Sequence, residues 1–268
     1  MTTQAVDALR SIHLQVGELI SGFDEDDWAR ASGCEGWRVH EILAHMSSNM
    51  KQIADPDPAA AAVPDDAKAE EMMEQLVQPR RSWDHELLLR EYRENFDGWI
   101  AGLEALQEEP VASTVTPMVD LGEYEMHMIA NAYAFDHYCH LYVDLLRPSG
   151  PIEADLGEPT HEMVRPGIDW MIAGVPKMQP IEMPAAVSKP LRLVLTGPGG
   201  GTWTVLPASA SGGIAVVEGA DGDVVATITS SAHDFVSWGT KRSDWRSSCD
   251  VTGDTGAAEP FLDALNII

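Results

Sequence analysis

The feature of this sequence that most constrains its fold is a change in hydrophobic pattern along the chain. Up to about residue 175, apolar residues recur at spacings of three and four, which is the period of an amphipathic helix. From residue 191 onward they gather in short β-branched runs separated by glycine, proline and aspartate, which is typical of strands. The proline-rich segment 176–190 is typical of a linker. We therefore expect two domains, residues 1–175 and 191–268.

The first domain is expected to be all-α. Gly33 and Gly36 separate its first two helices, and the Pro- and Asp-rich segment 54–67 predicts a mobile loop. A further helical stretch begins after Pro151 and ends at about Val175. The four main helical patterns cover residues 4–22, 39–53, about 83–107 and about 125–146.

The second domain is expected to have an α+β fold. The runs LRLVLTG, GTWTVLPA, IAVVEG and VVATITS have the lengths and turn residues of an antiparallel sheet. A short helix is predicted around 232–238, a strand near 249–252 and a final helix at 259–268. The whole chain is thus a helical domain followed by a small antiparallel sheet with helices.

Charge and composition exclude some functions. A formal net charge of −26 argues against a nucleic-acid partner, whose phosphates need a positive surface. No apolar run approaches the ~18 residues of a membrane helix, and the N-terminus has no secretion-signal pattern. The three cysteines are odd in number and widely spaced, as expected of reduced thiols. We expect a soluble cytoplasmic protein in which an arginine would hold any anionic substrate.

Asp136 and His140 form the most informative pair in the chain. Residues four apart share one face of a helix, and this face continues the apolar stripe that should meet the core. A lone buried carboxylate is costly unless it is paired, protonated or bound to metal. The stripe consists of Met126, Ile129, Tyr133, Asp136, His140 and Val143.

His45, at the edge of the apolar stripe of the second helix, is a candidate third ligand. Two histidines and one aspartate suit Zn²⁺ and leave a coordination position open, as in catalytic zinc sites. His137 could replace Asp136 as the second ligand, although the stripe favours Asp136. A simple hydrogen bond between Asp136 and His140 on one helix is the alternative to a metal site.

The clearest basic cluster lies in SWGTKRSDWR (237–246), where Trp238 and Trp245 flank Lys241 and Arg242. On an acidic protein such a cluster could hold an anionic group. A solvated helix end explains it equally well.

The order of several motifs resembles the mycothiol-dependent maleylpyruvate isomerase family. The helix beginning GWRVHEILAH (36–45) is followed by the Asp136–His140 pair and then by DLLRPSGP (144–151). The later motifs are LTGPGG (195–200), WGTKR (238–242) and VTGD (251–254). The resemblance covers nearly the whole chain and implies a DinB-like four-helix bundle followed by a C-terminal α+β domain.

The resemblance also implies a set of site residues. The family binds a divalent metal, usually zinc, through one histidine of the second helix and a Glu-x-x-x-His pair of the fourth. Here these positions are His45, Asp136 and His140, with the shorter Asp in place of Glu. The family's basic cleft residue, which would act in catalysis and help bind the cofactor, corresponds best to Arg242. Arg81, with its neighbour Arg80, resembles a second basic position that would help bind the cofactor.

The implied cosubstrate is the low-molecular-weight thiol mycothiol, and the implied substrate is a small electrophile. A metal-activated thiolate could isomerise a cis alkene by addition and elimination, or it could be transferred to the electrophile. The alternatives are a non-haem Fe(II) enzyme, because two histidines and a carboxylate also form that facial triad, and a non-catalytic metal- or thiol-binding protein. A homodimer stays open, since such bundles often pair, but no heptad pattern marks an interface.

Overall fold

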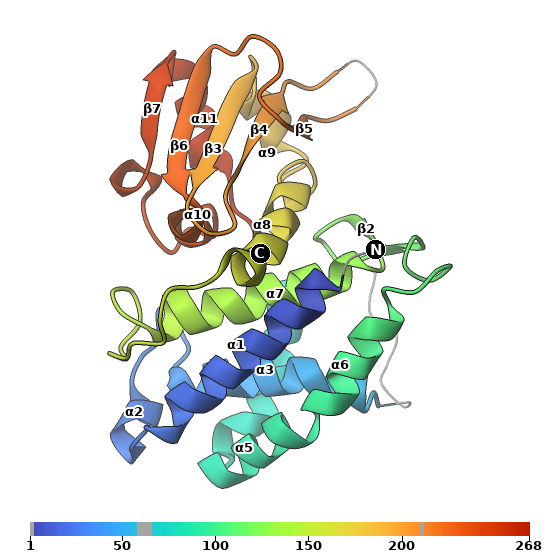
Figure 1. Cartoon of the computed structure of the whole chain (residues 1–268), viewed down its shortest axis with the longest axis vertical. Coiled ribbons are helices and arrows are strands. Elements are labelled where there is room, and N and C mark those ends of the chain that lie inside the picture. The colour runs from blue at the N-terminus through green and yellow to red at the C-terminus, as the bar shows by residue number, and fades with distance from the viewer. Residues whose placement is uncertain (1–2, 58–65, 210–211) are drawn as a thin grey trace. The chain divides into compact units, whose positions relative to one another are not determined.

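The computed structural model describes residues 3–57, 66–209 and 212–268 (Figure 1). The chain divides into two compact units, the first ending at Glu158 and the second beginning at Pro159. A helical part followed by a sheet with helices confirms the expected fold class. Residues 58–65, which belong to the loop expected at 54–67, lie outside the described residues.

The division between the units differs from the expected boundary at residue 175. Helix α8 (His161–Gly174) packs against α10 (Ala232–Gly239), so it belongs to the second unit. The segment 176–190 is not a bare linker, because it contains α9 (Glu182–Ala186), which packs on α11 (Thr255–Ala264). Hydrophobic periodicity identified these segments but could not show which neighbours they pack against.

The first unit contains the four expected main helices, two of them interrupted. Additional short elements, among them a β-hairpin, were not predicted. The elements of this unit are α1 (Gln4–Ser21), α2 (Glu25–Ala29), α3 (Val39–Ala54), α4 (Ala69–Val77), the 3₁₀ helix η1 (Gln78–Ser82), α5 (His85–Glu94), α6 (Phe96–Ala105), β1 (Val115–Pro117), β2 (Glu123–Glu125), α7 (Met128–Cys139) and the π-helical turn η2 (His140–Leu145).

The helix expected at 83–107 is two helices that meet at Asn95. The Asn95 side chain donates a hydrogen bond to the carbonyl oxygen of Glu91 and so competes with a continuous helix. Helix α6 then lies close to α3: a Cβ at Gly102 would come within 2.4 Å of the Ile53 side chain. Gly102 thus permits a close approach that a larger side chain would prevent.

Helix α3 is the central helix of the first unit. It packs against α5 and α6, while α1 packs against α7 (Figure 1). Every residue from Val39 to Met50 is buried. A helix buried on all sides is usually apolar, but this one carries Glu41, His45 and Asn49. Buried polar groups need hydrogen-bonding partners. These three side chains are therefore candidate functional positions on the helix.

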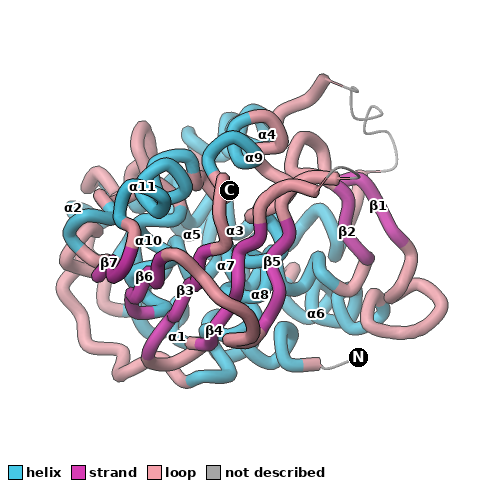
Figure 2. The backbone as a smooth tube through the Cα atoms, turned by 90° about the horizontal axis from the view of Figure 1, so that it is seen from above, coloured by secondary structure: helices cyan, strands magenta, loops and turns pink. Residues whose placement is uncertain are grey.

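The second unit is built on a five-stranded sheet in the order β5-β4-β3-β6-β7 (Figure 2). The strands are β3 (Leu191–Thr196), β4 (Gly201–Leu206), β5 (Ala215–Glu218), β6 (Ala226–Ser231) and β7 (Asp250–Gly253). Helices α10 and α11 pack against it, with the 3₁₀ helix η3 (Trp245–Ser247) near the end of the unit. Leu191, Leu193 and Leu195 are buried in alternation along β3, as one covered sheet face requires.

Three of the four strand pairs in this sheet are antiparallel, as expected, and the fourth is not. Strands β3 and β6 are parallel, from Leu191 opposite Ala226 to Thr196 opposite Ser231. Residues 219–225 look like a hairpin turn in the sequence, yet they connect β5 at one edge of the sheet to β6 beyond β3. The Arg192 guanidinium donates hydrogen bonds to two carbonyl oxygens of this connection. Turn residues predict a change of direction but not which strand comes next in the sheet.

Among the described residues, no helix is long and apolar enough to cross a membrane.

Candidate metal centre

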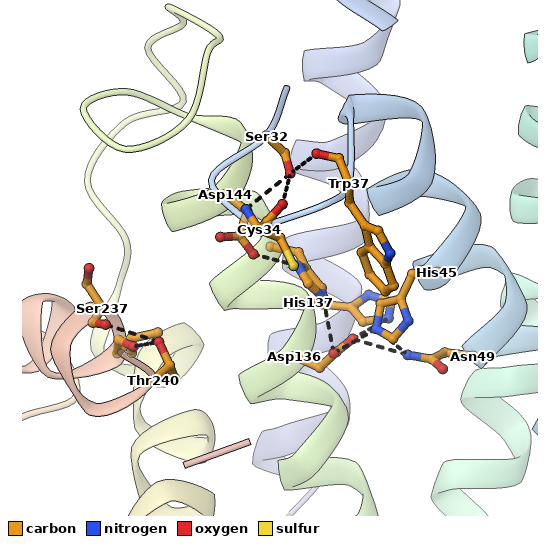
Figure 3. Close-up of polar contacts among 12 residues, drawn as sticks. Ser32, Cys34, Trp37, His45, Asn49, Asp136, His137, Asp144, Ser237 and Thr240 are labelled. Carbon is orange, nitrogen blue, oxygen red and sulfur yellow. Dashed lines mark hydrogen bonds and ion pairs between the residues drawn. The ribbon is translucent and has the colours of Figure 1, made fainter. Parts of the chain in front are cut away.

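Helix α3, helix α7 and the π turn η2 that follows α7 bring the three predicted ligands together. His45 Nε2 lies 2.9 Å from Asp136 Oδ1, and His140 Nε2 lies 3.4 Å from the same oxygen. One ligand atom from each residue lies within 4.8 Å of the other two. Figure 3 shows Asp136 and His45 turned toward each other, with Asn49 beside them. The predicted grouping of donor atoms is therefore present in the fold.

The spacing of these atoms fits a divalent metal. Donors about 2.0–2.1 Å from a tetrahedral zinc ion lie about 3.4 Å from one another. The observed separations of 2.9 and 3.4 Å from Asp136 lie close to that value. Two imidazoles and one carboxylate are also a donor set that zinc accepts. Together, His45, Asp136 and His140 could hold the metal that the sequence predicts.

The site is enclosed, with its most accessible ligand at Asp136. The side chains of His45 and His140 are 3% and 5% exposed, whereas that of Asp136 is 24% exposed. The indole of Trp37 lies beside the imidazole of His45, at a centroid distance of 5.1 Å (Figure 3). Its centroid lies 6.1 Å from that of the His140 ring. Any fourth ligand would therefore approach from the side of Asp136.

Charges within the site shift the pKa values of its groups. Burial by itself would raise the pKa of Asp136, but the neighbouring His45 and His140 hold it well below its ordinary value. Burial likewise would lower the pKa of His140, yet Asp136 and Asp144 raise it to about 9. The metal-free site therefore holds a proton on His140 at neutral pH, next to an ionised Asp136.

His137 lies outside this group. Its ring stacks on Trp99 at a centroid distance of 4.9 Å, and neither ring nitrogen has a hydrogen-bond partner. Burial lowers the pKa of His137 to about 3, so the ring is neutral. The geometry therefore groups Asp136, and not His137, with the two other histidines.

Sequence reasoning missed the residues that surround the three candidate ligands. Asn49 Nδ2 lies 3.1 Å from His45 Nε2 and donates to Asp136 Oδ2 at 3.2 Å. Asp144 Oδ2 lies 2.7 Å from His140 Nδ1. The signal for Asp144 was present in the sequence, because it follows His140 by four residues within an apolar stretch. Asn49 could have been noticed as the polar residue one turn after His45.

The two arginines before α5, Arg80 and Arg81, each form an ion pair with a glutamate. Arg80 forms a paired contact with Glu91, through Nε at 2.6 Å and Nη2 at 2.7 Å. Arg81 donates from Nη2 to both carboxylate oxygens of Glu74, and Glu74 accepts a hydrogen bond from Trp37 Nε1. Arg81 is therefore connected to the site through Glu74 and Trp37. Its predicted role in cofactor binding stays a prediction.

The contacts of Arg80 predict a structural role. Its side chain is 10% exposed and that of Glu91 is 11% exposed. Removing one member of such a buried pair leaves the other charge uncompensated, so Arg80→Leu should lower the free energy of unfolding by about 3 kcal/mol. Denaturant titration measures this change. Unchanged stability with a raised KM would instead place Arg80 in substrate binding.

Arg242 lies in the second unit, in the turn after α10, where its amide donates to the carbonyl oxygen of Ser237. Its basic neighbours hold α11: Lys241 Nζ donates to the carbonyl oxygen of Asp263, and Arg246 pairs with the Asp263 carboxylate. The side chain of Arg242 is half-buried. Its predicted place beside the substrate stays a prediction.

A family model and two solved structures that resemble this chain all belong to the same kind of protein. The family model described as mycothiol maleylpyruvate isomerase N-terminal domain matches residues 9–142, half of the chain. Two solved structures of a mycothiol-dependent maleylpyruvate isomerase, one of them a mutant, are 14% identical in sequence. Each comparison covers 94% of this chain and 96% of the other, with TM-scores of 0.57 and 0.58. At this identity the two structures establish a shared fold. The search of curated proteins found no match.

The matched residues include His45, Asp136 and His140, which the fold brings together. The chain therefore belongs to the mycothiol maleylpyruvate isomerase N-terminal domain family, a family of enzymes.

Proposed function

We propose that this protein binds a divalent metal, zinc in the first place, through His45, Asp136 and His140, and uses it to activate the thiol of mycothiol. The activated thiol attacks a small electrophile, and cis–trans isomerisation of a maleylpyruvate-type substrate is the reaction that family membership favours. The convergence of three donor atoms from α3, α7 and η2 supports this proposal most strongly.

Each ligand would contribute differently. A bound zinc ion supplies a positive charge that favours the thiolate form of a coordinated thiol. His45 and His140 would bind through neutral imidazoles. His140 must therefore first lose the proton that the neighbouring carboxylates of Asp136 and Asp144 stabilise on its ring. Asp136 is ionised already and brings a negative charge. Its partly exposed side chain marks the side from which the thiol would enter.

The proposed reaction conserves the thiol. The sulfur forms a bond to one carbon of a cis alkene conjugated with a carbonyl group, and the π electrons move to the carbonyl oxygen as an enolate. The former double bond is now single and rotates. Collapse of the enolate expels the same thiolate and leaves the trans alkene. If the adduct is protonated and released instead, the net reaction is transfer of the thiol to the substrate.

The fate of mycothiol separates the two outcomes. We expect the purified enzyme to convert maleylpyruvate to fumarylpyruvate with a catalytic amount of mycothiol, which is recovered unchanged. Consumption of one thiol per product would indicate a transferase. A preparation that contains iron and not zinc, and that turns over without thiol, would contradict the proposal and favour the Fe(II) alternative.

We further propose that Arg242 binds the substrate carboxylate and that Arg81 helps to bind mycothiol. A charge-assisted hydrogen bond contributes roughly 1.5–3 kcal/mol, so Arg242→Gln should raise KM about tenfold to a hundredfold. Arg246→Gln is the matched control, because Arg246 is tied to Asp244 and Asp263. Steady-state kinetics with both variants test this assignment. Equal KM values for the two variants would remove Arg242 from substrate binding.

A further inference from the structure

We infer that Asp144 is the positioning residue of the metal centre: its carboxylate holds the His140 ring so that Nε2 faces Asp136 and His45. This inference rests on the proposed metal site. Asp144 lies in η2, four residues after His140, and this position gives it the role.

The first observation is the contact itself. Asp144 Oδ2 lies 2.7 Å from His140 Nδ1, while His140 Nε2 lies 3.4 Å from Asp136 Oδ1. A neutral imidazole carries its proton on one nitrogen and a lone pair on the other. With Nδ1–H donated to Asp144, the lone pair is on Nε2, which faces the other two candidate ligands. A carboxylate behind a histidine ligand also makes the imidazole a stronger donor.

The second observation is that Asp144 has little freedom to move. Its side chain is fully buried. Its carbonyl oxygen accepts a hydrogen bond of 2.8 Å from the Gly33 amide. A Cβ at Gly33 would lie 3.0 Å from the Asp144 Cα and 3.1 Å from the Val143 carbonyl oxygen, so only glycine allows this approach without a shift. The backbone on both sides of the contact thus fixes the carboxylate relative to the ring.

The third observation is the shape of the helix. Helix α7 widens into the π turn η2 at His140, and the Leu146 amide donates to the carbonyl oxygen of Leu141, five residues earlier. Single π turns inside α-helices are often found at functional sites. Here the wider turn contains both His140 and Asp144. The irregular segment of the helix is therefore the one that holds the candidate ligand and the residue that orients it.

The test compares metal affinity in two buried-carboxylate variants. Asp144→Asn keeps the size of the side chain and removes its charge. Loss of such a partner of a metal-bound histidine lowers metal affinity about 10–100-fold. Glu91→Gln is the control, because Glu91 is a nearly buried carboxylate that contacts Arg80 and Ser47 but none of the candidate ligands. It should lower stability and leave metal affinity unchanged.

Zinc affinity is measured by competition with a chromophoric chelator, and Co²⁺ substitution adds a spectroscopic readout. We expect Asp144→Asn alone to weaken zinc binding and to alter the visible Co²⁺ spectrum. Wild-type affinity and spectrum in Asp144→Asn would overturn this inference and leave the metal site standing. A wild-type protein that binds neither metal would overturn the proposed function itself.

A measurement on the unaltered protein covers the case in which Asp144→Asn does not fold. In zinc-loaded wild-type protein with ¹⁵N-labelled histidine, His140 should show a protonated Nδ1 and a metal-bound Nε2. NMR distinguishes the two nitrogens, and a His140→Gln spectrum identifies the signal. A metal-bound Nδ1 would exclude the role that we assign to Asp144.

Discussion

Replacing His140 with alanine should abolish stoichiometric zinc binding and lower turnover about 1000-fold. That factor corresponds to roughly 4 kcal/mol of lost transition-state stabilisation, and metal catalysis contributes several kcal/mol of this kind. His45→Ala should have the same effect, because in the proposed site each imidazole would supply one of three protein ligands. Metal analysis by mass spectrometry and a thiol-dependent activity assay measure the two consequences.

The control for these variants lies on the same helix as His45. His40 is 4% exposed and contacts the carbonyl oxygen of Arg80, 3.0 Å from its Nε2. His40→Ala therefore removes a buried imidazole and should lower stability, while zinc stays bound. Retention of one zinc per chain in His140→Ala, or its loss in His40→Ala, would contradict the assignment of ligands.

Zinc binding should weaken about 1000-fold between pH 9 and pH 6. Burial by itself would lower the pKa of His140, but Asp136 and Asp144 together raise it to about 9. A metal can bind only after this proton leaves, so apparent affinity falls about tenfold per pH unit below the pKa. Asp136, whose pKa is held well below its ordinary value, stays ionised throughout and adds nothing to the slope.

The same proton affects the stability of the metal-free protein in the opposite direction. A histidine with a raised pKa in the folded state contributes stability that is complete below pH 6.5. That contribution is lost as pH rises through about 9. Competition titrations over this pH range and denaturant titrations of metal-free protein test both trends. Zinc affinity independent of pH between 6 and 9 would contradict metal binding by a His140 whose pKa is raised to about 9.

The candidate metal site was largely predictable because its geometry is mostly local. Asp136 and His140 are four residues apart, and any helix places such residues on one face. The stripe shared with apolar residues showed that this face meets the core. His45 was predicted from its place at the edge of another stripe. Resemblance to a family assigned His45 and the Asp136–His140 pair to one site, and the structure brings these residues together.

The surroundings of the candidate ligands were less predictable because they depend on tertiary contacts. Helical spacing could have suggested Asp144 as a partner of His140, but the π turn at this position has no simple sequence signal. Trp37 reaches the imidazoles from a loop. Arg80 resembled part of a second basic position of the family, but in the structure it forms an ion pair with Glu91. For Trp37 and Arg80, the deciding contact joins residues that no local pattern relates.

In the fold, too, local features were predictable and tertiary contacts were not. Helix and strand segments were predicted from periodicity, while their order in space was not. Asn95 divides one expected helix through a side-chain contact with its own backbone. The parallel pairing of β3 with β6 depends on the path of residues 219–225 and not on their turn-forming composition. Helix α8 belongs to the second unit because it packs against α10.

The most direct test of the account is a crystal structure of the zinc-loaded protein with anomalous scattering data collected at the zinc edge. We expect one zinc peak about 2.0–2.2 Å from Nε2 of His45, Nε2 of His140 and an oxygen of Asp136. A peak held by other residues, or none at this position in protein shown to contain zinc, would contradict it.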